Sequence, residues 1–571
     1  MLLKRIIILV IVGLTACARS DNGASPADAA DIVFRGSNII TVDEAHAGAT
    51  AVAVKGTDIV AVGSVDDVSK LVGDATRVVE LGDRALVPGF IDAHGHMAFV
   101  ARLVDFANLS SPPVGPVETI DDLVRILTQH IEASGAAPGE WVYGYGYDDS
   151  LLAENRHPNR DDLDRASTQH PIALMHVSGH LAAVNSAALA AKNVNSLSEN
   201  PPGGVIRRRP GTSEPNGVME ELAAFQFVMN DFDKIDPARL QEMVRESVDI
   251  HASFGITTIQ DGASTLADVT AMTDAAASKP FNADVVAFPM ATTLDDETLD
   301  SIQPSAGYVG GFRVGGIKFM LDGSPQGRTA YLSEPYAEGP PGADADYRAY
   351  PAYPAEEFNP RIARLIEAGV PTLVHANGDG AIDMLIEGVA SALEQTGPKD
   401  HRTVVIHAQL TREDQLHRYK ELGLVPSYYA VHPFFWGDWH RKSFGDDRAL
   451  FISPVARTAE LGIPFSIHND SPVVPPDVMR LMWVAVNRKT RSGFVLGADQ
   501  RATPMQALHA VTLGAAYQYF EEDRKGSITP GKQADLVVLG ANPLTVDPDT
   551  IKDIQIVETF ARGKSIYRNK N

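Results

Sequence analysis

Short runs rich in valine and isoleucine, separated by glycine and aspartate, dominate both ends of the chain. Near the start they are DIVFRGSNIITV (31–42) and ATAVAVKGTDIVAVG (49–63), and near the end GSITPGKQADLVVLG (526–540) and IQIVETFARGKSIYR (554–568). Branched residues bounded by turn formers are typical of short β-strands. The matching texture predicts one small β-sandwich domain formed from both chain ends, residues 31–87 together with 525–571.

Between these ends, apolar strand-like runs alternate with helical stretches such as AIDMLIEGVASALEQ (381–395). Eight runs fit strands, at residues 87–96, 171–177, 255–262, 314–321, 370–377, 403–409, 424–432 and 463–470. Repeated strand–helix units favour an α/β fold with a (β/α)8 TIM barrel, here spanning residues 88–524. Because the segment 107–222 is long for one connection, we expect it to be an insertion that could cover the barrel mouth.

The first residues have the pattern of a lipoprotein signal peptide. Lys4 and Arg5 precede an apolar stretch, 6–14, that is far shorter than the ~20 residues of a membrane-spanning helix. The letters LTAC at 14–17 resemble the bacterial lipobox, whose cysteine becomes the lipidated first residue of the mature protein. An ordinary cleaved signal with an incidental Cys17 is the alternative.

These features predict where the protein resides. We expect residues 1–17 to be signal peptide and lipobox, Cys17 to carry lipid, and 18–30 to be a flexible tether. Since Ala18 rather than Asp follows the cysteine, the sequence favours a lipid anchor in the bacterial outer membrane, facing the periplasm. A membrane surface is therefore an expected partner.

Charge and cysteine content exclude some classes of protein. The 49 Lys and Arg against 73 Asp and Glu give a net charge of −24, which argues against a nucleic-acid partner. The single cysteine excludes a disulfide framework. A small-molecule substrate is expected, and a homo-oligomer is compatible with the sequence.

The run VPGFIDAHGHM (87–97) is apolar until it ends in His94 and His96. Side chains alternate along a strand, so these two imidazoles point the same way, with Gly95 between them. Two imidazoles on one side of a strand end can hold one metal ion, whereas two unrelated polar loop residues would be the plain alternative.

Four further polar residues occupy the ends of later strand candidates. They are Lys318 in GGIKFMLDGS, His375 in LVHANGD, His407 in VIHAQ and Asp470 in FSIHNDSP. In a (β/α)8 barrel the active site is built at the carboxyl ends of the strands, so these side chains are expected to converge with the two earlier histidines.

The chain resembles the amidohydrolase superfamily, and more closely the branch called amidohydrolase family 3, the YtcJ-like metal-dependent hydrolases. The resemblance is carried by PGFIDAHGHM, GIKFMLDGSPQGRTA, HANGDGAID, HAQL and HNDSPV, with WVYGYGYDDSLL, VSGHLAAVNSAAL and GSITPGKQADLVVL. It implies that His94 and His96 hold the more buried metal and that His375 and His407 hold the second. It also implies that Asp470 contacts the first metal and acts as general acid/base.

Lys318 matches the lysine that many superfamily members carboxylate and use to bridge both ions. An ammonium has donors only and cannot ligate a cation, whereas a carbamate has two oxygens suited to metals about 3.5–4 Å apart. An unmodified lysine that pairs with a substrate carboxylate is the alternative. Zinc is the expected cofactor, with two ions favoured over one, because imidazole and carboxylate oxygen suit it.

Several other residues are candidates for contact with substrate. Phe434, Phe435 and Trp436 follow a barrel strand in YAVHPFFWGDWH, where an apolar or aromatic group could rest, although packing of a long loop would explain them equally. His180, in SGHLAAVNS, is expected to be a structural or pocket histidine rather than a metal ligand. His468 shares the strand face of Asp470, at a position where many superfamily members have a small residue.

The favoured function is hydrolysis of a non-peptide amide or related C–N bond, of the N-acyl or N-formyl type, by metal-activated hydroxide with Asp470 as general acid/base. N-substituted formamide deformylation is a known activity of this branch. Two alternatives remain: a metal-dependent esterase or lactonase using the same site, and a non-catalytic surface lipoprotein that binds a ligand.

Overall fold

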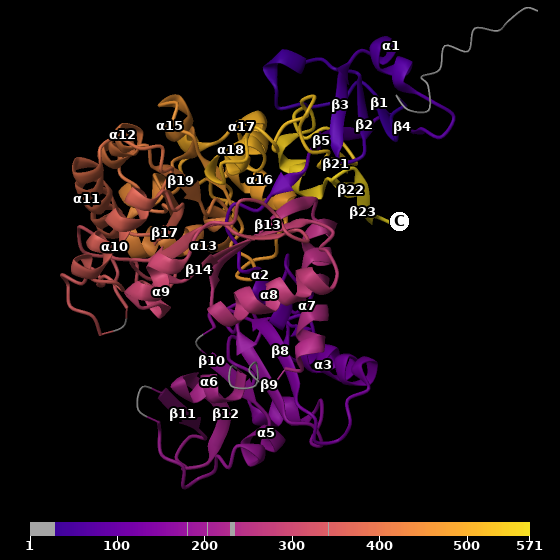
Figure 1. The fold of residues 1–571 in the computed structure, drawn as a ribbon. Helices are drawn as coiled ribbons and strands as arrows, with labels where there is room; N and C mark the ends of the chain where they lie inside the picture. The colour runs from indigo at the N-terminus through magenta and orange to yellow at the C-terminus, as the bar shows by residue number, and fades with distance from the viewer. Residues whose placement is uncertain (1–28, 180, 202–203, 229–234, 341, 571) are drawn as a thin grey trace, which may run out of the picture.

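The computed structural model describes residues 29–570, except 180, 202–203, 229–234 and 341 (Figure 1). The predicted signal peptide and Cys17 lie outside these described residues. Within the described part of the chain, no helix is both long and apolar enough to cross a membrane.

Both ends of the chain contribute to one pair of β-sheets. The first sheet has the order β3-β2-β1-β4 and the second β23-β22-β21-β5. Their strands are β1 (Ile32–Arg35), β2 (Ala51–Lys55), β3 (Asp58–Gly63), β4 (Arg77–Glu80), β5 (Ala85–Pro88), β21 (Leu536–Leu539), β22 (Ile556–Ala561) and β23 (Lys564–Arg568). One hydrophobic cluster joins the two sheets, and within it the rings of Phe34 and Phe560 pack edge to face at 5.2 Å.

The middle of the chain forms two arcs of parallel strands. One arc has the order β15-β14-β13-β6 and the other β16-β17-β18-β19-β20. The strands are β6 (Phe90–Ile91), β13 (Ile256–Ser264), β14 (Asp284–Pro289), β15 (Phe312–Val314), β16 (Ile317–Met320), β17 (Thr372–Ala376), β18 (Val404–His407), β19 (Val425–Tyr428) and β20 (Ser466–Ile467). The arcs meet at both ends. At one end Met290 and Lys318 form a parallel β-bridge, and at the other the backbone N–H of Asp470 donates a 3.1 Å hydrogen bond to the carbonyl oxygen of His94.

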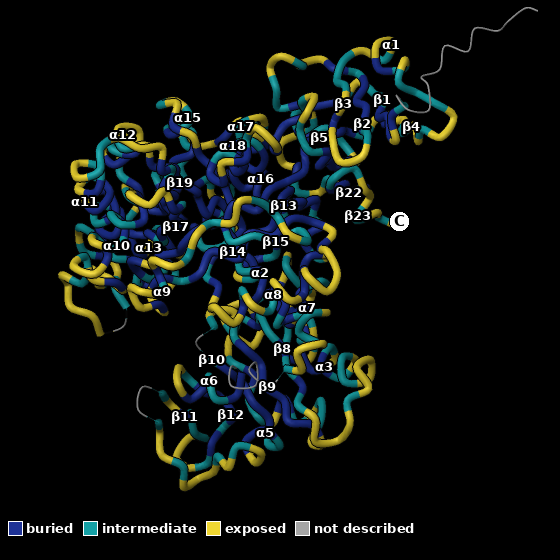
Figure 2. The backbone as a smooth tube through the Cα atoms, viewed as in Figure 1, coloured by how far each residue is buried: buried dark blue, intermediate teal, exposed yellow. Residues whose placement is uncertain are grey.

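Helices cover the outside of these arcs (Figure 1). The larger ones are α7 (Pro237–Ser253), α8 (Leu266–Ser278), α10 (Ala355–Ala368), α11 (Asp379–Thr396), α12 (Glu413–Leu422), α13 (His432–Phe444) and α16 (Val478–Asn487). Local sequence sets their ends: Thr265 and Asp268 form a capping box at the start of α8, and Gly369 ends α10 at a φ of 72°. The buried residues in Figure 2 lie mainly between helices and strands, where one apolar cluster fills the space.

Shorter helices complete this part of the chain. They are α2 (Met97–Arg102), α9 (Asp296–Ser301), α14 (Asp446–Leu450), α15 (Val455–Glu460), α17 (Pro504–Ala510) and α18 (Leu513–Gln518), whereas α1 (Val65–Val68) packs beside β2 and β3 of the first sheet. Helix α2 begins directly after His96 and leads the chain into the long connection that follows.

Residues 107–228 form a third unit, below the arcs in Figure 1. Its six-stranded sheet has the order β11-β12-β10-β9-β8-β7, with two hydrophobic clusters of its own. The elements are β7 (Ala107–Asn108), β8 (Val142–Tyr147), β9 (Ile172–His176), β10 (Leu181–Val184), β11 (Gly204–Arg208) and β12 (Pro215–Glu221), with α3 (Ile120–Ser134), α4 (Arg160–Asp164), α5 (Ser186–Ala191) and α6 (Leu222–Val228).

One predicted barrel strand is therefore wrong. The run 171–177 forms β9 of this separate sheet, and β14 at Asp284–Pro289 takes its place beside β13. Both runs are short and apolar, and hydrophobic periodicity alone does not say which sheet a buried strand joins.

Candidate metal centre

The structure brings three of the predicted ligands together at one edge of the strand arcs. His94 and His96 follow β6, and Asp470 follows β20. One ligand atom from each lies within 4.8 Å of the others. Asp470 Oδ1 is 3.1 Å from His96 Nε2 and 3.6 Å from His94 Nε2, distances that suit a single ion between them.

The other predicted residues adjoin this group. His407 Nε2 lies 3.0 Å from His375 Nδ1, so these two nitrogens also face one point. Lys318 Nζ lies 3.1 Å from His94 Nε2, and the rings of His94 and His407 are 5.3 Å apart. All six polar strand-end residues expected to converge therefore lie in one continuous cluster.

The protein also fixes which nitrogen of two of these histidines faces the cluster. His94 Nδ1 lies 2.5 Å from Gln260 Oε1, and His375 Nε2 lies 3.0 Å from the carbonyl oxygen of Gly323. These oxygens accept the ring N–H, which leaves the lone pair of the opposite nitrogen directed into the site. Such outer partners orient imidazoles that bind metals.

The carboxylate of Asp470 provides a test of whether a cation fits. Its Oδ1 is buried and has no hydrogen-bond partner among the described residues, although His96 Nε2 lies 3.1 Å away. A buried polar atom without a partner is costly. A cation between Asp470 and the two histidines would satisfy that oxygen, and the donor set of imidazole and carboxylate suits zinc.

Lys318 lies in a setting that disfavours its charged form. It is 2% exposed, and burial lowers its pKa to about 7. Lys525, another buried lysine, differs because Asp284 and Glu521 pair with it at 2.7 and 3.2 Å. Among the described residues, no carboxylate forms such a pair with Lys318, so its amine is chemically available.

Acidic groups at the site have contrasting environments. Burial raises the pKa of Asp470, but His96, His468 and Lys318 outweigh burial and leave that pKa below its usual value. Burial raises the pKa of Asp92 to about 7. Asp470 and His407 also adopt left-handed backbone conformations, with φ of 57° and 73°, as strained residues at functional sites often do.

Sequence reasoning missed several residues that support the site. They include Gln260, Asp92 and also Asp322, whose carboxylate accepts bonds from the backbone N–H groups of Tyr331, Asn377 and Gly378. The only available signal was a polar residue directly after an apolar run, as Asp92 follows VPGFI.

The predicted substrate-contact residues have different outcomes. Phe434, Phe435 and Trp436 lie on the first turns of α13 and are half-buried. His468 is 1% exposed and bonds protein partners through both ring nitrogens, which argues against its predicted contact with substrate. His180 lies outside the described residues.

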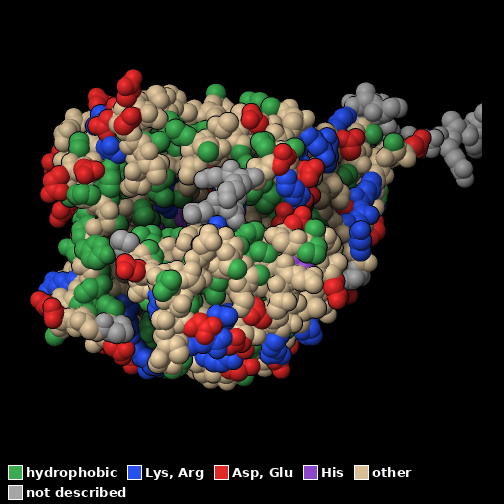
Figure 3. Space-filling view, turned by 90° about the horizontal axis from the view of Figure 1, so that it is seen from below, with side chains coloured by type: hydrophobic (Ala, Val, Ile, Leu, Met, Phe, Trp, Pro, Cys, Tyr) green, Lys and Arg blue, Asp and Glu red, His purple; other side chains and the backbone are tan. Residues whose placement is uncertain are grey.

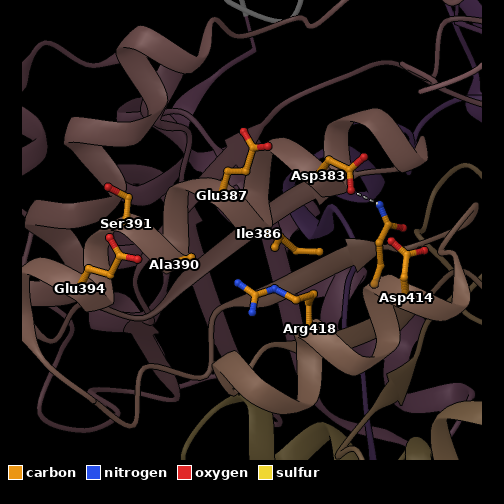
Figure 4. A pocket seen from close by; sticks show the side chains of 9 residues that line it. Asp383, Ile386, Glu387, Ala390, Ser391, Glu394, Asp414 and Arg418 are labelled. Carbon is orange, nitrogen blue, oxygen red and sulfur yellow. Dashed lines mark hydrogen bonds between the residues drawn. The ribbon is translucent and has the colours of Figure 1, made fainter.

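The surface near the third unit is hollowed, and hydrophobic side chains gather along the hollow on the face seen in Figure 3. A separate depression of about 470 Å³ lies between α11 and α12 (Figure 4). It is lined by side chains of these outer helices, including Asp383, Glu387 and Arg418, and none of the predicted site residues lines it.

The chain is similar to several known proteins over nearly its whole length. N-substituted formamide deformylase of Arthrobacter pascens is 27% identical over 548 residues, covering 94% of this chain and 98% of that protein. The Bacillus subtilis protein YtcJ is 25% identical over 555 residues, covering 94% and 99%. An uncharacterized metal-dependent hydrolase from Pyrococcus furiosus superimposes with a TM-score of 0.70 at 22% identity, covering 90% of this chain and 100% of that one.

The family model for amidohydrolases matches residues 77–567, which is most of the chain. The family expected from the sequence motifs is thereby confirmed, and with it the expectation of a hydrolytic enzyme. This chain belongs to the amidohydrolase family.

Proposed function

We propose that this amidohydrolase cleaves a non-peptide carbon–nitrogen bond in an N-acyl or N-formyl compound, at a metal centre built from its strand ends. The observation that carries the proposal is the convergence of six residues. Three pairs lie at 3.0–3.1 Å, namely Lys318 with His94, Asp470 with His96 and His375 with His407, and the rings of His94 and His407 are 5.3 Å apart. Similarity to a formamide deformylase over nearly the full length of both chains supports the choice of a C–N bond.

The proposed frame for this centre is a closed (β/α)8 barrel over residues 88–524. Support comes from the two contacts that link the parallel arcs, Met290 with Lys318 and His94 with Asp470. The paired sheets of the chain ends would then be a β-sandwich domain, and residues 107–222 an insertion over the barrel mouth.

Two zinc ions are the proposed cofactor. His94, His96 and Asp470 would hold one ion, and His375 and His407 the other, with Lys318 as a carbamate between them. When bound, zinc supplies Lewis acidity, which polarises a substrate carbonyl and lowers the pKa of water. The low pKa of Lys318 supports its conversion, since only a neutral amine reacts with carbon dioxide.

Asp470 is the proposed general acid/base. Because its pKa is held below the usual value, its carboxylate is ionised at neutral pH and can accept a proton from the attacking water. The water oxygen bonds to the carbonyl carbon, and the C–N bond then breaks. Asp470 returns the proton to the leaving nitrogen, so that a free amine and a carboxylic acid result.

Aromatic side chains suggest the kind of group that the substrate carries. The ring of Tyr429 stacks on His468 at 5.2 Å, and Trp436, Phe435 and Phe434 follow at ring separations of 6.1, 5.5 and 5.1 Å. This row of rings leads away from the centre. An apolar or aromatic substituent on the substrate nitrogen would pack against it.

A substrate panel tests the proposed function. Purified zinc-loaded protein is assayed with N-substituted formamides, N-acetyl amines, and esters and lactones of matched size. We expect the highest kcat/KM for N-formyl compounds with an aromatic nitrogen substituent. A consistent preference for esters would make the protein an esterase, and metal binding without turnover of any compound would favour a ligand-binding protein.

We also propose that Cys17 anchors the protein to the cell envelope, in the outer membrane and facing the periplasm. The support is the sequence pattern alone, with its short apolar stretch before LTAC. Mass spectrometry of the native membrane fraction should find residues 1–16 removed and lipid on Cys17. An unmodified Cys17 there would contradict the anchor.

A further inference from the structure

His407 lacks the oxygen partner that two of the other proposed ligand histidines have. His94 and His375 each donate a ring N–H to an oxygen, from Gln260 and Gly323. His407 instead has a second imidazole behind it, because its Nδ1 lies 3.0 Å from His468 Nε2. His468 is therefore placed where an orienting partner is needed.

Both ring nitrogens of His468 are engaged by the protein. Its Nδ1 lies 2.9 Å from Ser427 Oγ, and the ring of Tyr429 stacks on its face at 5.2 Å, inclined by 20°. The residue is 1% exposed. It therefore has no ring nitrogen left to bind a metal or to contact a substrate.

The order of these contacts fixes where the protons lie. For His407 to present the lone pair of Nε2 towards His375 Nδ1, 3.0 Å away, its proton must be on Nδ1. That N–H donates to His468 Nε2, so the proton of His468 is on Nδ1, where it faces Ser427 Oγ. The tautomer of His407 is thus set by the hydrogen bonds that run from His407 through His468 to Ser427.

The geometry assigns a positioning role to His468. Its ring is held by Ser427, and it keeps His407 in the ring orientation and tautomer that would bind the second metal ion. This inference rests on the proposed metal centre. It also accounts for an imidazole at a position where a small residue would leave His407 Nδ1 without this partner. Outer partners of this kind contribute about 10–100-fold to metal affinity.

The test is a metal titration. Metal-free full-length protein is titrated with Co²⁺ against a competing chelator, and visible absorption reports the two affinities separately. We expect His468→Leu to weaken the binding of one Co²⁺ ion by about 10–100-fold and to leave the affinity for the other ion unchanged. His468→Gln should recover most of the loss, because its side-chain oxygen can accept the His407 N–H.

His440→Leu is the matched control. His440 is also a buried histidine bonded to another, with its Nε2 2.9 Å from His432 Nδ1, but it contacts none of the proposed ligands. The His440→Leu substitution should lower thermal stability without changing the affinity for either Co²⁺ ion. If His468→Leu does not fold, Ser427→Ala takes its place, with an expected weakening of the same ion by several-fold.

The outcomes separate this inference from the function on which it rests. Unchanged Co²⁺ affinities in His468→Leu, or in Ser427→Ala if that variant is used, would overturn the positioning role, as would equal weakening of both ions. Wild-type protein that binds a single ion, unaffected by His468→Leu, would overturn it as well. Wild-type protein that binds no metal at all would instead refute the proposed function.

Discussion

At the scale of single residues, the site depends on groups that are buried yet left incompletely paired. Asp470 Oδ1 has no hydrogen-bond donor among the described residues, and Lys318 has no carboxylate partner among them. The buried ion pair of Asp284 with Lys525 shows the contrast. Groups prepared for a ligand rather than for the fold are typical of functional sites.

Replacement of Lys318 by Ala should lower metal content and activity together, because the proposed bridge between the ions is lost. Metal per protein is measured in the same samples as turnover. A short-chain carboxylic acid or bicarbonate should restore part of both, by supplying the missing oxygens. If Lys318→Ala kept two metals and full turnover, the bridging role would be wrong.

Replacement of Asp470 by Asn should reduce kcat by about 10²–10⁴-fold, the usual contribution of a positioned acid/base. Asparagine keeps the shape of the side chain but lacks the basic oxygen. Metal content should be largely retained, because four histidines and Lys318 hold the ions. Loss of metal and activity in strict proportion would make Asp470 a ligand only.

The site residues themselves were predictable because they stand out in sequence. Histidine pairs such as His94 and His96 interrupt apolar runs, and strand ends of parallel units share one edge. Their partners were not predictable, since Gln260 and Ser427 are ordinary polar residues whose role depends on strands far apart in the chain. The direction of each imidazole likewise follows only from these tertiary contacts.

At the scale of elements, the strands and helices follow local sequence more closely than their pairing does. The strand β9 has the predicted strand character, yet it joins the sheet of residues 107–221. Strand β14, which takes its predicted place, is an equally apolar run with no polar residue at its end to mark it. Membership of a sheet is decided by long-range packing, which periodicity does not report.

Helix α7 carries a prediction on pH. His251 on this helix is fully buried, donates from Nδ1 to Ser247 O at 2.7 Å, and has a pKa lowered by burial to about 4. Between pH 6.5 and 4 the unfolded chain therefore takes up a proton that the folded protein refuses, and stability falls as pH falls. Protonation at this one site costs up to about 3 kcal/mol.

Thermal unfolding of metal-free protein, followed from pH 7 to 4.5, checks this expectation. Because other buried groups also titrate, the informative quantity is the difference from His251→Gln, which should show a shallower decline. Parallel curves for the two proteins would mean that His251 does not contribute.

At the scale of the whole molecule, ion pairs connect the C-terminal segment to the strand arcs. Asp284 starts β14 and binds Lys525, which precedes β21, and Arg562, which lies between β22 and β23. Asp284 is 2% exposed, and removal of one partner from a buried pair costs about 3–5 kcal/mol.

Asp284→Ala should therefore lower the melting temperature markedly. Asp296→Ala is the control, because it removes a pair with Arg361 in which the Asp side chain is 59% exposed, worth under about 1 kcal/mol. Equal melting temperatures for the two variants would show that the buried network does not hold the units together.

The most direct test of the account is removal and return of the metal. Zinc is stripped from the purified protein with a chelator, graded Zn²⁺ is added back, and bound metal and hydrolysis of an N-substituted formamide are measured together. We predict that activity is lost with the metal, returns in proportion to bound Zn²⁺, and does not return in a His94→Asn, His96→Asn variant. Full hydrolytic activity in protein shown to contain no metal would contradict the account.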